Sequence, residues 1–108
     1  MANTFKLKTK ANVGVTTSDV YVVPSATTTV VIGVTLANTT GSSINVGVGV
    51  TRASSDDVKL MKNVPIPQGA SFEFMAGNKV VLETTDTLTV ESDVNNSLDV
   101  ALTIMEIT

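Results

Sequence analysis

Hydrophobic and polar positions alternate along most of this chain. Between Val30 and Thr51 (VVIGVTLANTTGSSINVGVGVT), one set of alternate positions is apolar and the other is small and uncharged. Because successive side chains of a β-strand point to opposite faces, this stretch predicts a core face and an outer face. The outer face lacks the charges that solvent-facing positions usually carry. The predicted core face consists of Val30, Ile32, Val34, Leu36, Ile44, Val46, Val48 and Val50.

Valine and threonine, which favour strands, are frequent throughout, and no window keeps the i, i+3, i+4, i+7 repeat of a helix. We therefore expect an all-β fold, a single antiparallel β-sandwich of about eight to nine short strands. An Ig-like and a jelly-roll topology both fit this pattern. The strands are predicted near residues 12–17, 19–23, 28–37, 43–52, 57–62, 70–75, 79–83, 86–92 and 97–107.

Turn-forming residues separate the predicted strands. Pro67 and Gly69 fit positions i+1 and i+3 of a type I turn that starts at Ile66. The segment Ala76-Gly77-Asn78 has the composition of a tight hairpin turn. Two polar loops are expected to close hairpins between consecutive strands, Asn38 to Ser43 (NTTGSS) and Asp93 to Ser97 (DVNNS).

The last predicted strand alternates most plainly. Its apolar side is formed by Leu98, Val100, Leu102 and Ile104, and its other side by Asp99, Ala101, Thr103 and Met105. Aromatic side chains bury large areas, so we also expect core positions for Tyr21, Phe72 and Phe74.

The first ten residues (MANTFKLKTK) differ from the rest of the chain. Three lysines alternate with Phe5, Leu7 and Thr9, so an extended segment would be basic on one side and more apolar on the other. We expect residues 1–10 to form an extended N-terminal arm and residues 11–108 to form the sandwich. Deletion of the arm is then expected to leave a folded domain that no longer joins its assembly.

Charge is sparse and unevenly placed. Charged residues make up 16% of the 108 residues, against about 25% in typical domains. Lys6, Lys8 and Lys10 precede every other charge, whereas the segment from Glu83 to the end carries acids and no base. Opposite charges of this kind indicate contact between the arm of one copy and the acidic region of another. Nucleic acid ranks below this partner, because three phosphate contacts give a salt slope of only about −2.7.

The chain offers little chemistry. It has no cysteine and no histidine, which removes thiol chemistry, disulfides and the commonest general base and metal ligand. The adjacent pair Asp56-Asp57 follows two serines and is typical of a solvated loop. We therefore expect no enzyme activity, no catalytic residue, no cofactor and no metal. Without tryptophan and with one tyrosine, a carbohydrate-binding module lacks the aromatic platform that sugar rings need.

Targeting signals are also lacking. No apolar run follows the N-terminal lysines, and the apolar runs elsewhere are too short to cross a bilayer. We expect a protein that is made in a cytoplasm and has no membrane partner.

The uncharged outer face has two interpretations. Its glycines mark bulges or twists, or they let a flat partner approach closely. The low charge favours the second interpretation, with the arm of the same chain or a neighbouring subunit as the partner, and hence a homo-oligomer. The predicted assembly interface comprises Phe5, Lys6, Leu7, Lys8, Lys10, Gly33, Thr35, Gly47 and Gly49.

Three segments carry a resemblance to a known group of proteins. They are Val20 to Thr40 (VYVVPSATTTVVIGVTLANTT), Ile66 to Ala70 (IPQGA) and Lys79 to Val90 (KVVLETTDTLTV). In their order and turn pattern they resemble small β-sandwich structural proteins of tailed bacteriophages, especially marine and cyanobacterial ones. The resemblance extends over nearly the whole chain.

This resemblance implies a virion component present in many copies. The function it favours is that of a capsid decoration or cement protein, which stabilises the head by multivalent, non-catalytic contacts with the major capsid protein. A structural role in the neck, tail or fibre is the alternative, with neck or tail proteins as partners. A carbohydrate-binding adhesion module ranks third. The implied location is the virion, after synthesis in the host cytoplasm.

Overall fold

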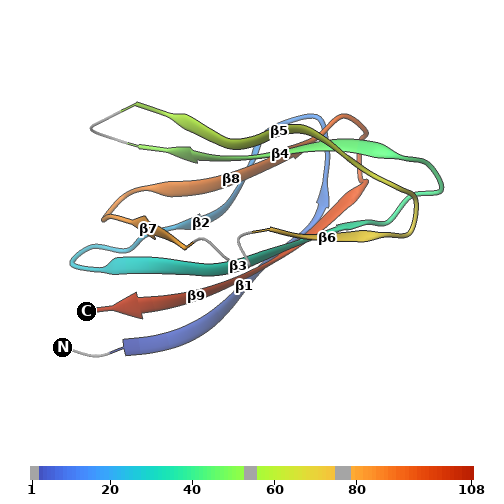
Figure 1. The fold of residues 1–108 in the computed structure, drawn as a ribbon. Helices are drawn as coiled ribbons and strands as arrows, with labels where there is room; N and C mark the ends of the chain where they lie inside the picture. Colours follow the sequence, from blue (N-terminus) through green and yellow to red (C-terminus); the bar gives the residue numbers. More distant parts are fainter. Residues whose placement is uncertain (1–2, 53–55, 75–78) are drawn as a thin grey trace.

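The structure, a computed structural model, describes residues 3–52, 56–74 and 79–108, with the backbone alone at Phe74. Within these residues the chain forms nine strands and no helix (Figure 1). The strands are β1 (Asn3–Val13), β2 (Ser18–Val22), β3 (Thr28–Asn38), β4 (Ile44–Thr51), β5 (Val58–Ile66), β6 (Ser71–Phe74), β7 (Val80–Leu82), β8 (Thr87–Ser92) and β9 (Leu98–Ile107).

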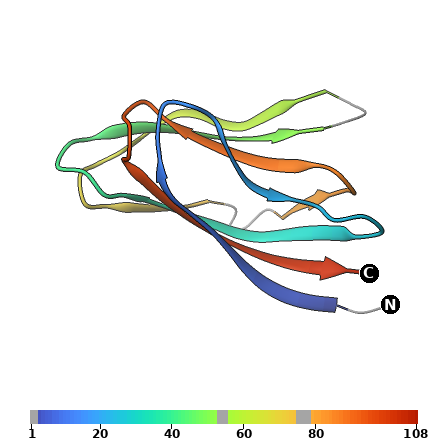
Figure 2. The ribbon, with the colours of Figure 1, turned by 180° about the vertical axis from the view of Figure 1, so that it is seen from behind.

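The strands form two antiparallel sheets that pack face to face (Figures 1 and 2). Sheet A has the order β1-β9-β3-β6, and β7 pairs with β3 beside β6. Sheet B has the order β2-β8-β4-β5. The expected all-β antiparallel sandwich is therefore confirmed.

Between the sheets lies one apolar core, contributed mainly by alternate valine, leucine and isoleucine residues of β3, β4, β8 and β9. The inward side expected for β9, with Leu98, Val100, Leu102 and Ile104, is confirmed. Tyr21 is also buried, whereas Phe72 lies near a sheet edge and is 38% exposed. The side chain of Phe74 lies outside the described part of the structure.

Most connections cross from one sheet to the other, and two predicted hairpins are therefore wrong. The loop at residues 39–43 leads from β3 in sheet A to β4 in sheet B, and residues 93–97 lead from β8 in sheet B to β9 in sheet A. β3 pairs with β6, β7 and β9, which are distant in sequence, whereas β4 pairs with its successor β5 and with the distant β8. Alternation alone does not reveal such partners, because a strand has the same period in either sheet.

A bulge in β3 changes which residues face the core. The register with β9 shifts between Val31 and Gly33, so Val31 is fully buried before the bulge and Val34 after it. An extra residue reverses the alternation at this point. The core positions predicted for Val30 and Ile32 are therefore wrong, and both side chains are only partly buried.

The expected arm forms most of β1, and the strand predicted at 12–17 begins much earlier. Residues 3–10 pair with β9 of the same chain in continuous antiparallel register. Within β1 only Val13 is buried, and this explains why the sequence pattern missed the strand. Backbone pairing, rather than burial of side chains, joins residues 3–10 to the sandwich.

The turn after β5 is displaced by one residue from its predicted position. The amide of Ala70 donates to the carbonyl of Pro67, and Gly69 between them has a φ of 68°. A positive φ at position i+2 is the geometry of a type II turn, with Pro67 at position i. The turn predicted at residues 76–78 lies outside the described residues.

Candidate assembly surfaces

The outer face of sheet A carries a row of apolar side chains that crosses four strands. Phe5 lies opposite Met105, Met105 opposite Val30, and Val30 opposite Val81. Residues paired in this way share one face of a sheet. Phe5 is 70% exposed and Val81 is 59% exposed. We call these four residues the ridge.

Further along the same face lies a shallow hollow of about 270 Å³. Its lining includes Lys10, Asp99 and Val100, and five small outward side chains form its floor. They are Thr9, Ala11, Thr35, Ala37 and Ala101. Between ridge and hollow runs a middle row in which Leu7, Thr103 and Gly33 lie opposite one another.

Two charged side chains of the described residues lie on this outer face, both at the end that holds the hollow. Among its described residues the charged ones are Glu73 on β6 and Asp99 at the start of β9. The carboxylate of Asp99 accepts a hydrogen bond from the Asn12 amide at 3.0 Å. The remainder of the face is apolar or neutral.

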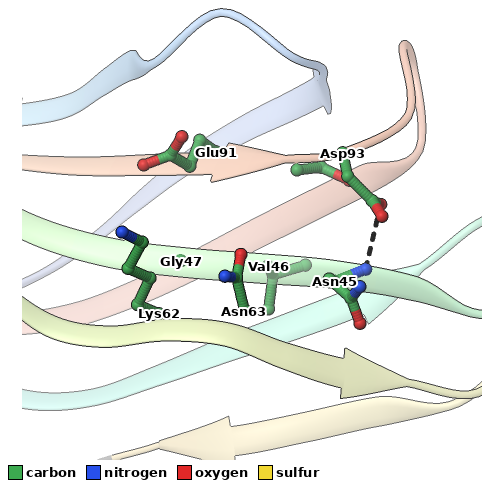
Figure 3. A pocket seen from close by; sticks show the side chains of 8 residues that line it. Asn45, Val46, Gly47, Lys62, Asn63, Glu91 and Asp93 are labelled. Atoms are coloured by element: carbon green, nitrogen blue, oxygen red, sulfur yellow. Dashed lines mark hydrogen bonds between the residues drawn. The ribbon is translucent and has the colours of Figure 1, made fainter.

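The outer face of sheet B has a different character. Lys59 on β5 and Glu91 on β8 form an ion pair of 2.7 Å on either side of β4. The two strands flank Gly47 and Gly49, which are both buried. Figure 3 shows Lys62 and Glu91 around Gly47. A hydrogen bond from the Asn45 amide to Asp93 closes one end of this region.

The nine predicted interface residues are therefore spread over three places. Phe5, Leu7, Gly33 and Thr35 share the outer face of sheet A, and Gly47 and Gly49 lie on the opposite side of the molecule. The expectation of one flat surface formed by β3 and β4 together is wrong, because these strands belong to different sheets. The three lysines occupy the inner side of β1.

A cost for side chains at Gly49 follows from its neighbours. A Cβ there would lie 3.0 Å from the Val58 carbonyl oxygen, whereas a Cβ at Gly33 would meet nothing within 4 Å. We expect Gly49→Ala to lower the free energy of unfolding by about 1–3 kcal/mol. Gly33→Ala should leave it unchanged or raise it by about 0.5–1 kcal/mol. Urea unfolding at low protein concentration measures both, and equal effects would contradict this packing.

The inner side of β1 is tied to the rest of the molecule by a buried carboxylate. Glu106 accepts a hydrogen bond from the Tyr21 hydroxyl at 2.5 Å and pairs with the Lys6 ammonium at 2.8 Å. The Tyr21 hydroxyl also lies 2.8 Å from the hydroxyl of Thr29. Lys8 lies 5.9 Å from the centre of the Tyr21 ring. This cluster joins β1, β2, β3 and β9.

The cluster changes the pKa of two groups. The hydrogen bond from Lys6, followed by that from Tyr21, lowers the pKa of Glu106 below its ordinary value. Burial, followed by the hydrogen bond to Glu106, raises the pKa of Tyr21 to about 12. Both shifts favour a charged Glu106 and a neutral Tyr21, which are the states that the hydrogen bonds require.

These shifts predict a dependence of stability on pH. The contribution of Glu106 is present above its unfolded pKa of 4.5 and is lost as the pH falls through the lower folded pKa. The contribution of Tyr21 is present below pH 10.0 and is lost as the pH rises towards 12. We expect Glu106→Gln to cost about 1–2 kcal/mol near neutral pH.

Urea unfolding of both proteins across the acid range tests this prediction. The difference between wild type and Glu106→Gln should shrink as the pH falls from 4.5 through the lower folded pKa, because the carboxylate binds a proton first in the unfolded chain and then in the folded one. A difference that stays constant with pH would contradict the assigned role of this carboxylate.

The described residues present no assembled reactive centre. In residues 3–52, 56–74 and 79–108, no three His, Cys, Asp or Glu side chains are grouped as a metal site requires. No helix in the same residues is suited to span a membrane.

Comparison with known proteins indicates the fold class and no family. No family model matches the chain, and no curated protein matches its sequence. A solved structure from work on Bacillus endospore appendages, described as a novel family of disulfide-linked pili, has a similar fold. The TM-score is 0.59 at 12% identity, over 99% of this chain and 87% of the other. At this identity the similarity supports the sandwich fold alone.

Two features of these surfaces were not predicted from the sequence. Val81 and Val30 belong to the ridge. Val81 lies in a continuous apolar run and Val30 precedes the bulge, so the alternation did not predict that their side chains face outward. Glu106 was predicted only as part of an acidic region. Its position among apolar residues of a strand (LTIMEIT) was the available signal for a buried, paired carboxylate.

Proposed function

We propose that this chain is a structural protein of a virion, most specifically a decoration protein of a tailed-phage head. The observation that carries the proposal is the outer face of sheet A, which is apolar or neutral apart from Glu73 and Asp99 and on which Phe5, Leu7 and Val81 are each more than half exposed. Contiguous apolar surface of this kind marks a site of protein–protein interaction.

The contrast with sheet B supports the proposal. The same short chain places Lys59, Lys62 and Glu91 on the outer face of sheet B but leaves the ridge and the middle row of sheet A without charge. Low overall charge therefore does not by itself account for the absence of charge from the ridge and the middle row. Such a face is costly for a monomer, and contact with other virion proteins and with further copies removes it from water.

The proposed mechanism is adhesion without catalysis. Many weak contacts on a symmetric particle together hold more tightly than any one contact. In the proposed form, the partners are the major capsid protein and neighbouring copies. In the neck, tail or fibre, the chain would bind through the same surface, but its partners would be neck or tail proteins.

A filament subunit is the second candidate, favoured by the structural similarity to a protein of pili. This chain has no cysteine, so a filament of it would be held by non-covalent contacts. Electron microscopy of the concentrated protein separates the two candidates, since filaments of the isolated protein favour the second.

Particles from a phage genome lacking this coding sequence provide the direct test. We expect wild-type particles to contain many copies of the chain, and the purified protein to rebind to the deleted particles with saturable stoichiometry. Thr35→Lys, on sheet A, should abolish rebinding, and Thr51→Lys, on sheet B, should preserve it. Wild-type particles without the chain would overturn the proposal.

A further inference from the structure

We propose that the outer face of sheet A binds the same face of a second copy, with the ridge of each copy seated in the hollow of the other. This inference rests on the proposed structural role and specifies the partner of the surface. Its basis is that ridge and hollow lie at equal distances from the middle row.

The register gives these distances. On β1, Phe5 and Thr9 each lie two residues from Leu7, and on β9, Met105 and Ala101 each lie two residues from Thr103. With a strand rise of about 3.3 Å per residue, ridge and hollow are each roughly 7 Å from the middle row.

This spacing suits a two-fold axis. We place the axis between the two copies, parallel to the middle row and therefore perpendicular to the strands. A rotation of 180° about this axis sets the ridge end of one copy over the hollow end of the other. Phe5 of one copy then meets the hollow beside Thr9 of the other, and Met105 meets Ala101. A two-fold interface must be self-complementary in this way.

The β9 and β3 positions of the middle row allow close approach at the axis. Gly33 has no side chain, and the position of its missing Cβ is free of other atoms within 4 Å. Thr103 opposite it is small. Leu7, at the β1 end of the row, meets Leu7 of the other copy across the axis as an apolar contact. Bulky apolar residues thus lie at one end of the face, and shorter side chains line the hollow at the other end.

The size of the face is close to what a stable dimer requires. Four strand positions spaced by about 4.8 Å and a strand of ten residues, such as β9, give a footprint of roughly 600 Å². A standard interface buries about 800 Å² of accessible surface on each partner. Because side chains add accessible area to a planar footprint, the whole outer face suffices.

Edge-to-edge pairing of two copies is disfavoured by the lysines. Two β1 strands paired antiparallel about a two-fold axis would set Lys6, Lys8 and Lys10 of one copy opposite the same row of the other. Like charges directly opposite one another destabilise a sheet. Face-to-face packing leaves these lysines at the side of the dimer.

Single cysteines test the position of the axis, since the natural chain has none. Thr103→Cys places a thiol near the axis, and Thr51→Cys places one on the outer face of sheet B as the control. With a short bismaleimide we expect at least tenfold more cross-linked dimer from Thr103→Cys. Equal cross-linking of the two variants would overturn the proposed axis.

A charge in the hollow tests the contact itself. Light scattering is expected to give a dimer for the wild type and for Thr51→Arg, and a monomer for Ala101→Arg. Circular dichroism and urea unfolding of diluted samples check that both variants are folded. A wild-type monomer at every accessible concentration, or a dimer that survives Ala101→Arg, would overturn the inference.

Failure of this inference and failure of the proposed function give different results. If the protein is a monomer and still rebinds to particles that lack it, the dimer is excluded and the structural role is supported. The particle surface then covers the outer face of sheet A. If the protein is a dimer but no virion contains it, the face-to-face contact is supported and the virion role is excluded.

Discussion

Replacement of Asn38 by aspartate is expected to lower the free energy of unfolding by about 3–5 kcal/mol, the cost of an unpaired buried charge. Asn38 is 4% exposed. Its amide nitrogen lies 2.7 Å, 3.0 Å and 3.1 Å from the carbonyl oxygens of Ser42, Ile66 and Pro67. A carboxylate oxygen in that place would face three acceptors and have no proton to donate.

Two further variants isolate the charge. Asn38→Ala removes the donor without adding a charge, and we expect a smaller loss of about 1–3 kcal/mol. Asn3→Asp makes the same chemical change at an exposed position of β1 and should alter stability by less than about 0.5 kcal/mol. Urea unfolding gives all three values. An Asn38→Asp protein as stable as Asn3→Asp would show that the amide does not hold these loops.

This asparagine matters because it joins connections that cross between the sheets. Its side chain links the loop after β3 to the turn after β5, and its backbone amide donates to the carbonyl of Ala70. Thr39 next to it donates to Ser97, in the loop before β9. The chain crossings thus depend on polar contacts at one end of the sandwich, near Ala37 in the hollow.

The strands themselves were largely predictable from period-two alternation. Val46 and Val48 face the core as expected, because β4 is regular on that side and its alternation is not reversed. The phase failed in β3, where a bulge reverses the alternation after Val31. A bulge adds one residue without a composition of its own, so a single sequence does not locate it.

The candidate surface was predictable only in part. Phe5, Leu7, Gly33 and Thr35 were predicted as interface residues and share the outer face of sheet A. The ridge as a whole was not predictable, because it brings together side chains from four separate strands whose order depends on tertiary pairing. Gly49 was misplaced for the same reason, since its strand β4 belongs to sheet B and β3 belongs to sheet A.

The first strand was missed because its stabilisation differs from that of the others. Its alternation of lysine with apolar residues predicts an extended arm, but the backbone of residues 3–10 pairs with β9. Lys6 makes its ion pair with a carboxylate distant in sequence, Glu106. Both charged residues are visible in the sequence, but the contact between Lys6 and Glu106 is not.

Removal of residues 1–13 is expected to destabilise the remaining chain strongly, in contrast to the arm that the sequence alone predicted. Residues 3–10 form eight cross-strand pairs with β9, each worth about 0.2–1 kcal/mol. The sum of roughly 2–8 kcal/mol is a large part of the stability of a small domain. The truncated chain also loses Val13 from the core and Lys6 from Glu106.

A synthetic peptide of residues 1–13 added to the truncated chain tests whether β1 is held by these contacts. We expect the wild-type peptide to restore cooperative unfolding and to raise the midpoint in urea, because binding to the folded state alone stabilises it by mass action. A Lys6→Glu peptide should fail, since it sets a second carboxylate beside Glu106. A Lys10→Glu peptide has the same net charge and no such neighbour in its register with Val100, so it should still rescue. Equal rescue by both variant peptides would show that backbone pairing alone holds the strand and that the Lys6–Glu106 contact contributes nothing to its placement.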